Sequence, residues 1–117
     1  MDNILIRVHE SYRWVVAVCD TDVFGRKLVD SGVGSRQSAV EGQEGESRRV
    51  LDVSGDFFKG EEFNEIEARG EIVRCANEDA TFNFVGKDSV ELAKELGIVK
   101  DEGVMEIEGV PVALVLL

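Results

Sequence analysis

The sequence contains little proline, histidine or cysteine. Among 117 residues there are one proline, one histidine, two cysteines and 12 glycines, so the chain is not of the linker or low-complexity type. Cys19 and Cys75 lie far apart, without a CxxC spacing or a neighbouring histidine. This pattern predicts two buried free thiols, with no disulfide, no metal site and no cofactor.

The sequence also lacks a long apolar run. No stretch reaches the roughly 18 apolar residues that a membrane-spanning helix needs. The first residues, MDNILIRVHE, include an acid at once and do not resemble a signal peptide. We therefore expect a cytoplasmic protein that does not bind membranes.

Basic residues are in the minority, with 13 against 24 acids and a net charge of -11. A nucleic-acid partner requires a basic footprint, so this balance disfavours RNA or DNA without excluding them. An acidic surface also keeps a protein soluble and is common where intracellular salt is high. The sequence leaves open whether the acidity is functional or an adaptation to salt.

Alternating and continuous apolar patterns predict six strands and two helices. The strands are expected at residues 4–8, 14–19, 49–53, 81–85, 104–107 and 110–117. Helices are expected at residues 61–76 and 88–96. The result is an α+β fold in one domain, residues 1–117, with a mixed, mostly antiparallel sheet. Residues 31–48 are rich in glycine and serine, which predicts a loop or arm.

Several smaller features are predicted from local patterns. The first helix is expected to bury Phe63, Ile66 and Val73, with Gly70 at a close crossing of a strand. In the second helix, Asp88 and Glu91 form a capping-box pattern, and Gly97 follows its last turn. Residues 108–109 read as a two-residue hairpin turn. Asp20 and Asp22 are expected to cap residues 23–25 rather than bind a cation.

The stretch from residue 81 to 92 is the first candidate site. A strand, a Gly-Lys turn and a helix N-terminus resemble the geometry that binds anions or small ligands. The candidate residues are Asn83, Gly86, Lys87 and Ser89. The full P-loop and dinucleotide patterns are absent, so plain helix capping is the alternative interpretation.

Four cations form the second candidate site. Arg7, Arg13, Arg26 and Lys27 would make a nucleic-acid patch if they converged at one end of the N-terminal hairpin; solvated charge is the alternative. No HExxH or GxSxG motif is present, and the single histidine, His9, has no catalytic partner in the pattern. An enzyme is therefore unsupported, and the catalytic residues, if any, are unknown.

Four blocks of sequence together resemble a known family. They are VVAVCD at 15–20 with FGRK at 24–27, DVSGDFFKGE at 52–61, FNFVGKDSVELAKELGIV at 82–99 and IEGVPVALV at 107–115. Their order and spacing resemble the small archaeal family catalogued as domain of unknown function number 424. The resemblance implies an archaeal cytosolic protein without an established activity. The family tends to have His-Ala-Gln where this chain has Val112, Ala113 and Leu114, so a polar site built on that histidine would be missing here.

We expect a non-enzymatic binding domain, and the family resemblance suggests RNA or the translation machinery as the candidate partner. The alternative is a small-molecule or anion-binding protein, or an enzyme, that uses the turn at residues 83–89. A third reading is a homodimer or structural partner, because the last strand is apolar on both faces.

Overall fold

The protein has an α+β fold in which helices lie on one face of a mixed sheet. The structure, a computed structural model, describes residues 3–30 and 49–116; the predicted Gly/Ser-rich loop at 31–48 lies outside the described residues. The six-stranded sheet has the order β5-β1-β2-β6-β8-β7, and a second sheet pairs β3 with β4. The strands are β1 (Ile4–His9), β2 (Val15–Asp20), β3 (Lys27–Asp30), β4 (Arg49–Asp52), β5 (Glu61–Phe63), β6 (Thr81–Val85), β7 (Met105–Ile107) and β8 (Val110–Leu116). The helices are α1 (Glu65–Ala76) and α2 (Lys87–Glu95), with a 3-10 turn at Asp101–Gly103.

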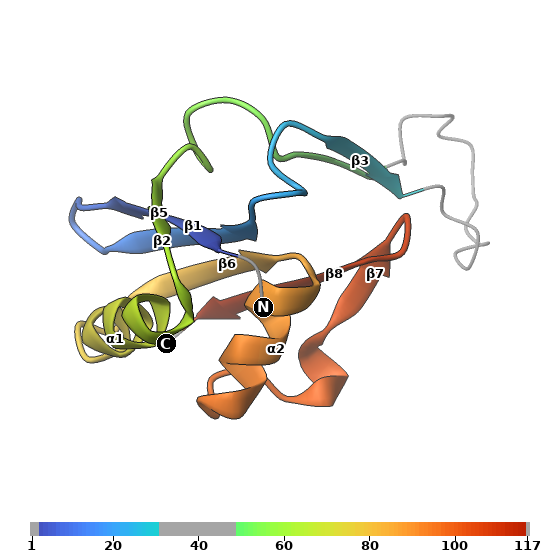
Figure 1. Ribbon diagram of the computed structural model, residues 1–117. Helices are drawn as coiled ribbons and strands as arrows, with labels where there is room; N and C mark the ends of the chain where they lie inside the picture. Colours follow the sequence, from blue (N-terminus) through green and yellow to red (C-terminus); the bar gives the residue numbers. More distant parts are fainter. Residues whose placement is uncertain (1–2, 31–48, 117) are drawn as a thin grey trace.

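The main core lies between the sheet and the two helices, which share one face (Figure 1). Every second residue of the central strands points into it, including Val16, Val18, Phe82 and Phe84, all fully buried. The two phenylalanine rings stack with their centroids 5.2 Å apart.

A smaller core covers part of the opposite face. There the β3–β4 pair and the following segment place Leu28, Val53 and Phe58 over Cys19 and Val85. Figure 1 shows this pair extending above the sheet, on the side away from the helices. The described residues consequently close the whole helical face of the sheet and part of the other face.

The predicted fold class is confirmed, with two helices and a mixed, mostly antiparallel six-stranded sheet. The pairings β1–β2, β6–β8 and β7–β8 are antiparallel, whereas β2 and β6 run parallel. The strand predicted at 49–53 belongs to the small sheet, not to the main one. Strands β3 and β5, of four and three residues, were not predicted; residues 61–63 of β5 lie in the range predicted for the first helix.

The predicted apolar face of α1 is wrong. Its buried residues are Ala68, Ile72 and Cys75, whereas Ile66 is 81% exposed. Gly70 has no heavy atom near its Cβ position and crosses no strand. The helix begins at Glu65, four residues later than predicted, because residues 61–63 pair with β1.

Both cysteines are free and buried, as predicted. Burial in an apolar environment raises the pKa of the Cys19 thiol to about 12 and that of Cys75 to about 11. Thiolate, the reactive form, is therefore scarce at neutral pH.

We expect neither thiol to react with a disulfide reagent such as 5,5′-dithiobis(2-nitrobenzoate) at pH 7.5 in the native protein. Both should react within seconds in 6 M guanidinium, where burial no longer suppresses the thiolate. Absorbance at 412 nm measures both rates. Rapid native reaction of one equivalent would contradict the burial of these side chains.

Candidate functional site

The N-terminus of α2 is occupied by a carboxylate of the chain itself. Asp20, the last residue of β2, is 4% exposed and accepts hydrogen bonds from the backbone N–H groups of Asp88 (2.9 Å) and Ser89 (2.8 Å). The hydroxyl of Ser89 donates a third bond, of 2.7 Å. Strands β2 and β6 are parallel, so their carboxyl ends meet at one edge, which brings Asp20 to the helix that follows β6.

This arrangement corrects two predictions. Asp20 does not cap residues 23–25 with its side chain; its carbonyl oxygen accepts the turn bonds from Val23 and Phe24 instead. The N-cap of α2 is Gly86, without a side-chain capping bond, so the capping box expected at Asp88 and Glu91 is absent. A partner 68 residues away replaces the local cap.

Gly86 is required where the carboxylate approaches the turn. Its φ is 118°, and a Cβ atom there would lie 2.4 Å from Cγ of Asp20. Any other residue would carry both the cost of this backbone conformation and a clash with the buried carboxylate. The glycine therefore permits Asp20 to reach the helix.

Burial raises the pKa of Asp20 above its ordinary value of 3.8. The hydrogen bonds from the Ser89 hydroxyl and from the backbone of Asp88 and Ser89 favour the ionised form and oppose this effect, and the nearby Asp88 carboxylate adds to the rise. The folded protein consequently holds this proton more tightly than the unfolded chain does.

The four residues of the predicted ligand site separate into two places. Gly86 and Ser89 face Asp20, on the helical side of the sheet, and Lys87 is exposed at the start of α2. Asn83 lies on the other face, since its strand neighbours in register are Ala17 and Leu114. The structure thus does not bring Asn83 together with the turn that follows β6.

The four predicted cations also lie apart. Arg13 lies in the turn before β2 and, with Tyr12, Trp14, Glu78 and Asp79, lines a cavity of about 670 Å³. Arg26 and Lys27 follow the far end of β2. Six extended residues put that end roughly 20 Å from the end beside Arg13. The cations do not converge at one end of the hairpin.

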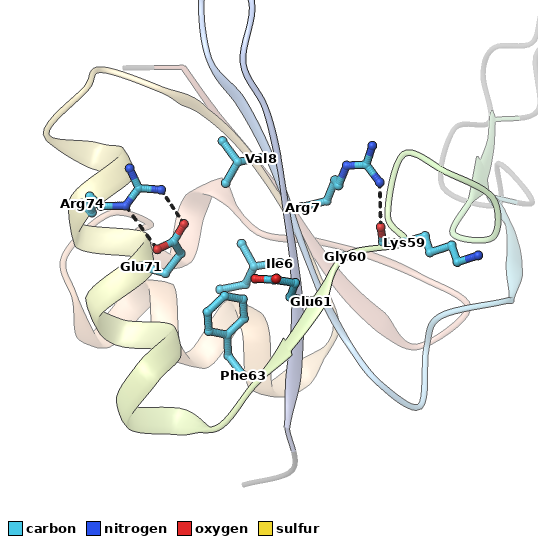
Figure 2. Close-up of a pocket in the computed structure, with 9 residues that line it drawn as sticks. All are labelled: Ile6, Arg7, Val8, Lys59, Gly60, Glu61, Phe63, Glu71 and Arg74. Carbon is cyan, nitrogen blue, oxygen red and sulfur yellow. Dashed lines mark hydrogen bonds and ion pairs between the residues drawn. The ribbon is translucent and has the colours of Figure 1, made fainter.

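Arg7 occupies a third position, in the middle of β1. Figure 2 shows it pointing away from Ile6 and Val8, which face α1. Its guanidinium donates a 3.0 Å hydrogen bond to the carbonyl of Lys59. These residues belong to a cavity of about 330 Å³ where Arg74 pairs with Glu71, at 2.6 Å. In this cavity the charge of Arg74 is thus neutralised by Glu71, and the guanidinium of Arg7 is held by a main-chain carbonyl.

The sheet surface away from the helices contains a part that no element within residues 3–30 and 49–116 covers fully. We call it the open face and define it by Val15, Thr81, Asn83, Leu114 and Leu116, which lie in two neighbouring rows of the register; Ala17, in the row of Asn83, belongs to the smaller core. Leu114 is 62% exposed and Leu116 is 75% exposed. The open face contains no carboxylate, although the chain has 24.

Strand β1 borders the open face. Arg7 and His9 are the next residues in the same two rows, paired with Ala17 and Val15. His9 stacks on Phe57 with ring centroids 4.8 Å apart, and its Nε2 lies 3.0 Å from the carbonyl oxygen of Phe57. Sequence reasoning identified Arg7 and Asn83 but assigned them to different sites. It missed the leucines as surface residues, although it noted that β8 is apolar on both faces.

Comparison with known proteins places this fold in a family. Residues 43–117 match the model described as protein of unknown function (DUF424). The chain belongs to this family. The predicted resemblance is therefore confirmed, although the block at residues 15–27 lies outside the matched range of the DUF424 model.

A solved structure extends the similarity to almost the whole DUF424 chain. It is the crystal structure of an uncharacterized conserved protein from the archaeon Methanopyrus kandleri, with 21% sequence identity and a TM-score of 0.71. The alignment covers 97% of this chain and 92% of the other. At this identity the likeness shows the fold. The comparison with curated proteins gave no match. Among the described residues, no helix is both long and apolar enough to span a membrane.

We expect Gly86→Ala to lower the free energy of unfolding by about 3 kcal/mol, because it combines a positive φ with displacement of a buried carboxylate. Gly97→Ala is the matched control: φ there is 77°, with no heavy atom near the Cβ position. It should cost only about 1–2 kcal/mol. Urea unfolding measures both. Equal losses would contradict the close contact between Gly86 and Asp20.

Titration of Asp20 should change stability in a defined direction. Because its folded-state pKa is raised, the folded protein binds more protons than the unfolded chain between pH 3.8 and that raised value. The contribution of Asp20 to the free energy of unfolding is therefore largest at low pH and falls as pH rises through this window.

Asp20→Asn removes this titration. The stability difference, wild type minus variant, should decrease as pH rises from about 4 to 7, as measured by urea unfolding at each pH. Asp22→Asn, an exposed acid two residues away, controls for the change in net charge. A difference that grows with pH would show that the hydrogen bonds outweigh burial and would contradict the raised pKa.

Proposed function

We propose that this DUF424 protein is a non-enzymatic binding domain whose partner is another protein that docks on the open face. The observation that carries the proposal is the exposure of Leu114 and Leu116 on a regular strand. Exposed leucines that occur singly are ordinary. These two lie two residues apart on the same face of β8, and they adjoin Asn83 and Thr81 on the neighbouring strand. Burying each would contribute roughly 1.5–3 kcal/mol to association before the costs of binding.

The polar residues of the open face suit a protein partner as well. Asn83 and Thr81 are half-buried and offer hydrogen-bonding groups between the apolar side chains. A specific protein interface combines such an apolar centre with hydrogen-bonding groups and a charged rim. Here Arg7 and His9 form one side of that rim.

The charge distribution favours protein over RNA. The net charge is -11, and the four cations expected to bind RNA lie in three separate places. Among the described residues, the guanidinium that borders the open face is that of Arg7, and it is already bonded to a main-chain carbonyl. RNA is accordingly the rival outcome of the experiment below.

The chemistry of the described residues supports binding rather than catalysis. His9 is engaged with the main chain of Phe57, and burial raises the pKa of both thiols. The amides at the start of α2 already bond Asp20, so an external anion would have to displace a buried carboxylate. This placement weighs against the turn at residues 83–89 as an anion site.

The test compares three tagged proteins as baits in lysate of the source cells: wild type, the double variant Leu114→Thr with Leu116→Thr, and Ile66→Thr. Threonine keeps the strand propensity of positions 114 and 116. Ile66 is the matched control, an apolar residue 81% exposed on α1. Unchanged urea midpoints would establish that all three fold.

We expect at least one protein that the wild type and the Ile66 variant retain and the double variant loses at least tenfold, by quantitative mass spectrometry. The purified partner should reproduce this difference in isothermal titration calorimetry. Equal retention by all three baits would contradict the proposal. Enrichment of RNA, with proteins lost after nuclease treatment, would replace it by the RNA reading.

A further inference from the structure

The outer edge of β8 is only partly paired. Strand β7 pairs with Val110, Pro111 and Val112, while β6 pairs with the opposite edge as far as Leu116. In the described part of the chain, no strand pairs with the outer edge of residues 113–116. This stretch, Ala-Leu-Val-Leu, contains neither a charge nor a proline, the two devices that most often protect an edge from pairing.

The direction of the main-chain groups follows from one hydrogen bond. The carbonyl of Pro111 accepts from the amide of Gly86, so the main-chain groups of Pro111 point towards β6. Because these directions alternate along a strand, Ala113 and Val115 also point towards β6. Leu114 and Leu116 therefore direct their N–H and C=O groups to the outer edge.

A cavity lies beside this edge. It has a volume of about 520 Å³ and is lined by Leu114, Val115 and Leu116 on one side and by the segment from Ile98 to Gly103 on the other. It forms where the chain entering β7 diverges from β8, so it is continuous with the unpaired edge. An added strand would find both main-chain partners and an apolar recess for side chains there.

The net charge of the chain indicates which charged residues a partner strand should have. The cavity has one cation, Lys100, and one acid, Glu102, on its rim, so it is locally balanced. The whole chain is strongly acidic, at -11, which attracts a basic segment and repels a second acidic copy. Complementarity thus favours a segment with apolar residues at alternate positions and basic residues at its ends.

We infer that the outer edge of β8 binds an extended, basic-flanked segment of a partner protein, which adds a strand at Leu114 and Leu116 and places side chains in the adjoining cavity. This inference rests on the proposed function and specifies how the partner engages β8. It differs from docking by side chains alone, because it requires the outward amides of these two leucines.

The probe is a synthetic peptide, acetyl-KKVTVTVKK-amide, with EEVTVTVEE as the charge control and KKVTPTVKK as the strand-breaking control. Hydrogen exchange by NMR follows individual amides of the full chain. Without peptide, the amides of Leu114 and Leu116 should exchange at least tenfold faster than those of Ala113 and Val115. The lysine-flanked peptide should slow Leu114 and Leu116 at least tenfold, and both control peptides should do so less.

Leu116→Pro removes one outward N–H and keeps an apolar side chain, whereas Leu116→Thr keeps the N–H. We expect the proline variant to weaken binding of the lysine-flanked peptide at least tenfold and more than the threonine variant does, by fluorescence anisotropy. Comparable urea midpoints would show that both variants fold.

Four results would overturn the inference. Slow exchange of Leu114 and Leu116 in the free, dilute protein would mean that the edge is already closed. Protection that rises with protein concentration would assign the edge to a second copy. Equal binding of all three peptides, or equal loss in both variants, would exclude main-chain pairing. If the bait experiment succeeds while this one fails, the open face binds protein through side chains alone.

Discussion

The structure depends on the contact between the Asp20 carboxylate and the first amides of α2. It ties the end of β2 to the element that follows β6 and so connects the two parallel strands at the centre of the sheet. Helix termini leave several N–H groups without intrahelical partners, and here a buried charge satisfies two of them. Gly86 makes the contact possible by leaving the space that a side chain would fill.

This contact also bears on which face of the sheet is covered, because it holds α2 on one side. Together α1 and α2 close that face with a continuous core, while the described residues cover the opposite face with the small core around Leu28 and Val53. The remaining surface, with Leu114 and Leu116, stays accessible. Because Asp20 already accepts hydrogen bonds from amides at the N-terminus of α2, an external anion would have to compete with it there.

Much of the fold could be predicted from the sequence, because strands β1, β2, β6 and β8 carry strong apolar patterns. The hairpin turn predicted at Glu108-Gly109 is present, with both residues at positive φ. The buried face of α1 could not be predicted, since Ile66 and Val73 are apolar yet exposed and Ala68 is small yet buried. The partner of Asp20 could not be predicted either, because a local capping pattern says nothing about a carboxylate 68 residues away.

The candidate site was harder to predict than the fold for a related reason. Arg7 and Asn83 belong to one row of the sheet only through the register of two strand pairs, β1–β2 and β2–β6, which no single segment encodes. The leucines of β8 fit a buried strand by every sequence criterion. Their exposure follows from the shortness of β7 and from the limited reach of the β3–β4 pair.

The most direct test of the central claim is photo-cross-linking in cells, with p-benzoylphenylalanine at position 114 in one protein and at position 66 in another. Both positions are exposed and apolar, but only the first lies on the open face. We predict a discrete protein adduct from position 114 that is absent from position 66. The same adducts from both positions, or none from position 114, would contradict the assignment of the open face as the binding surface.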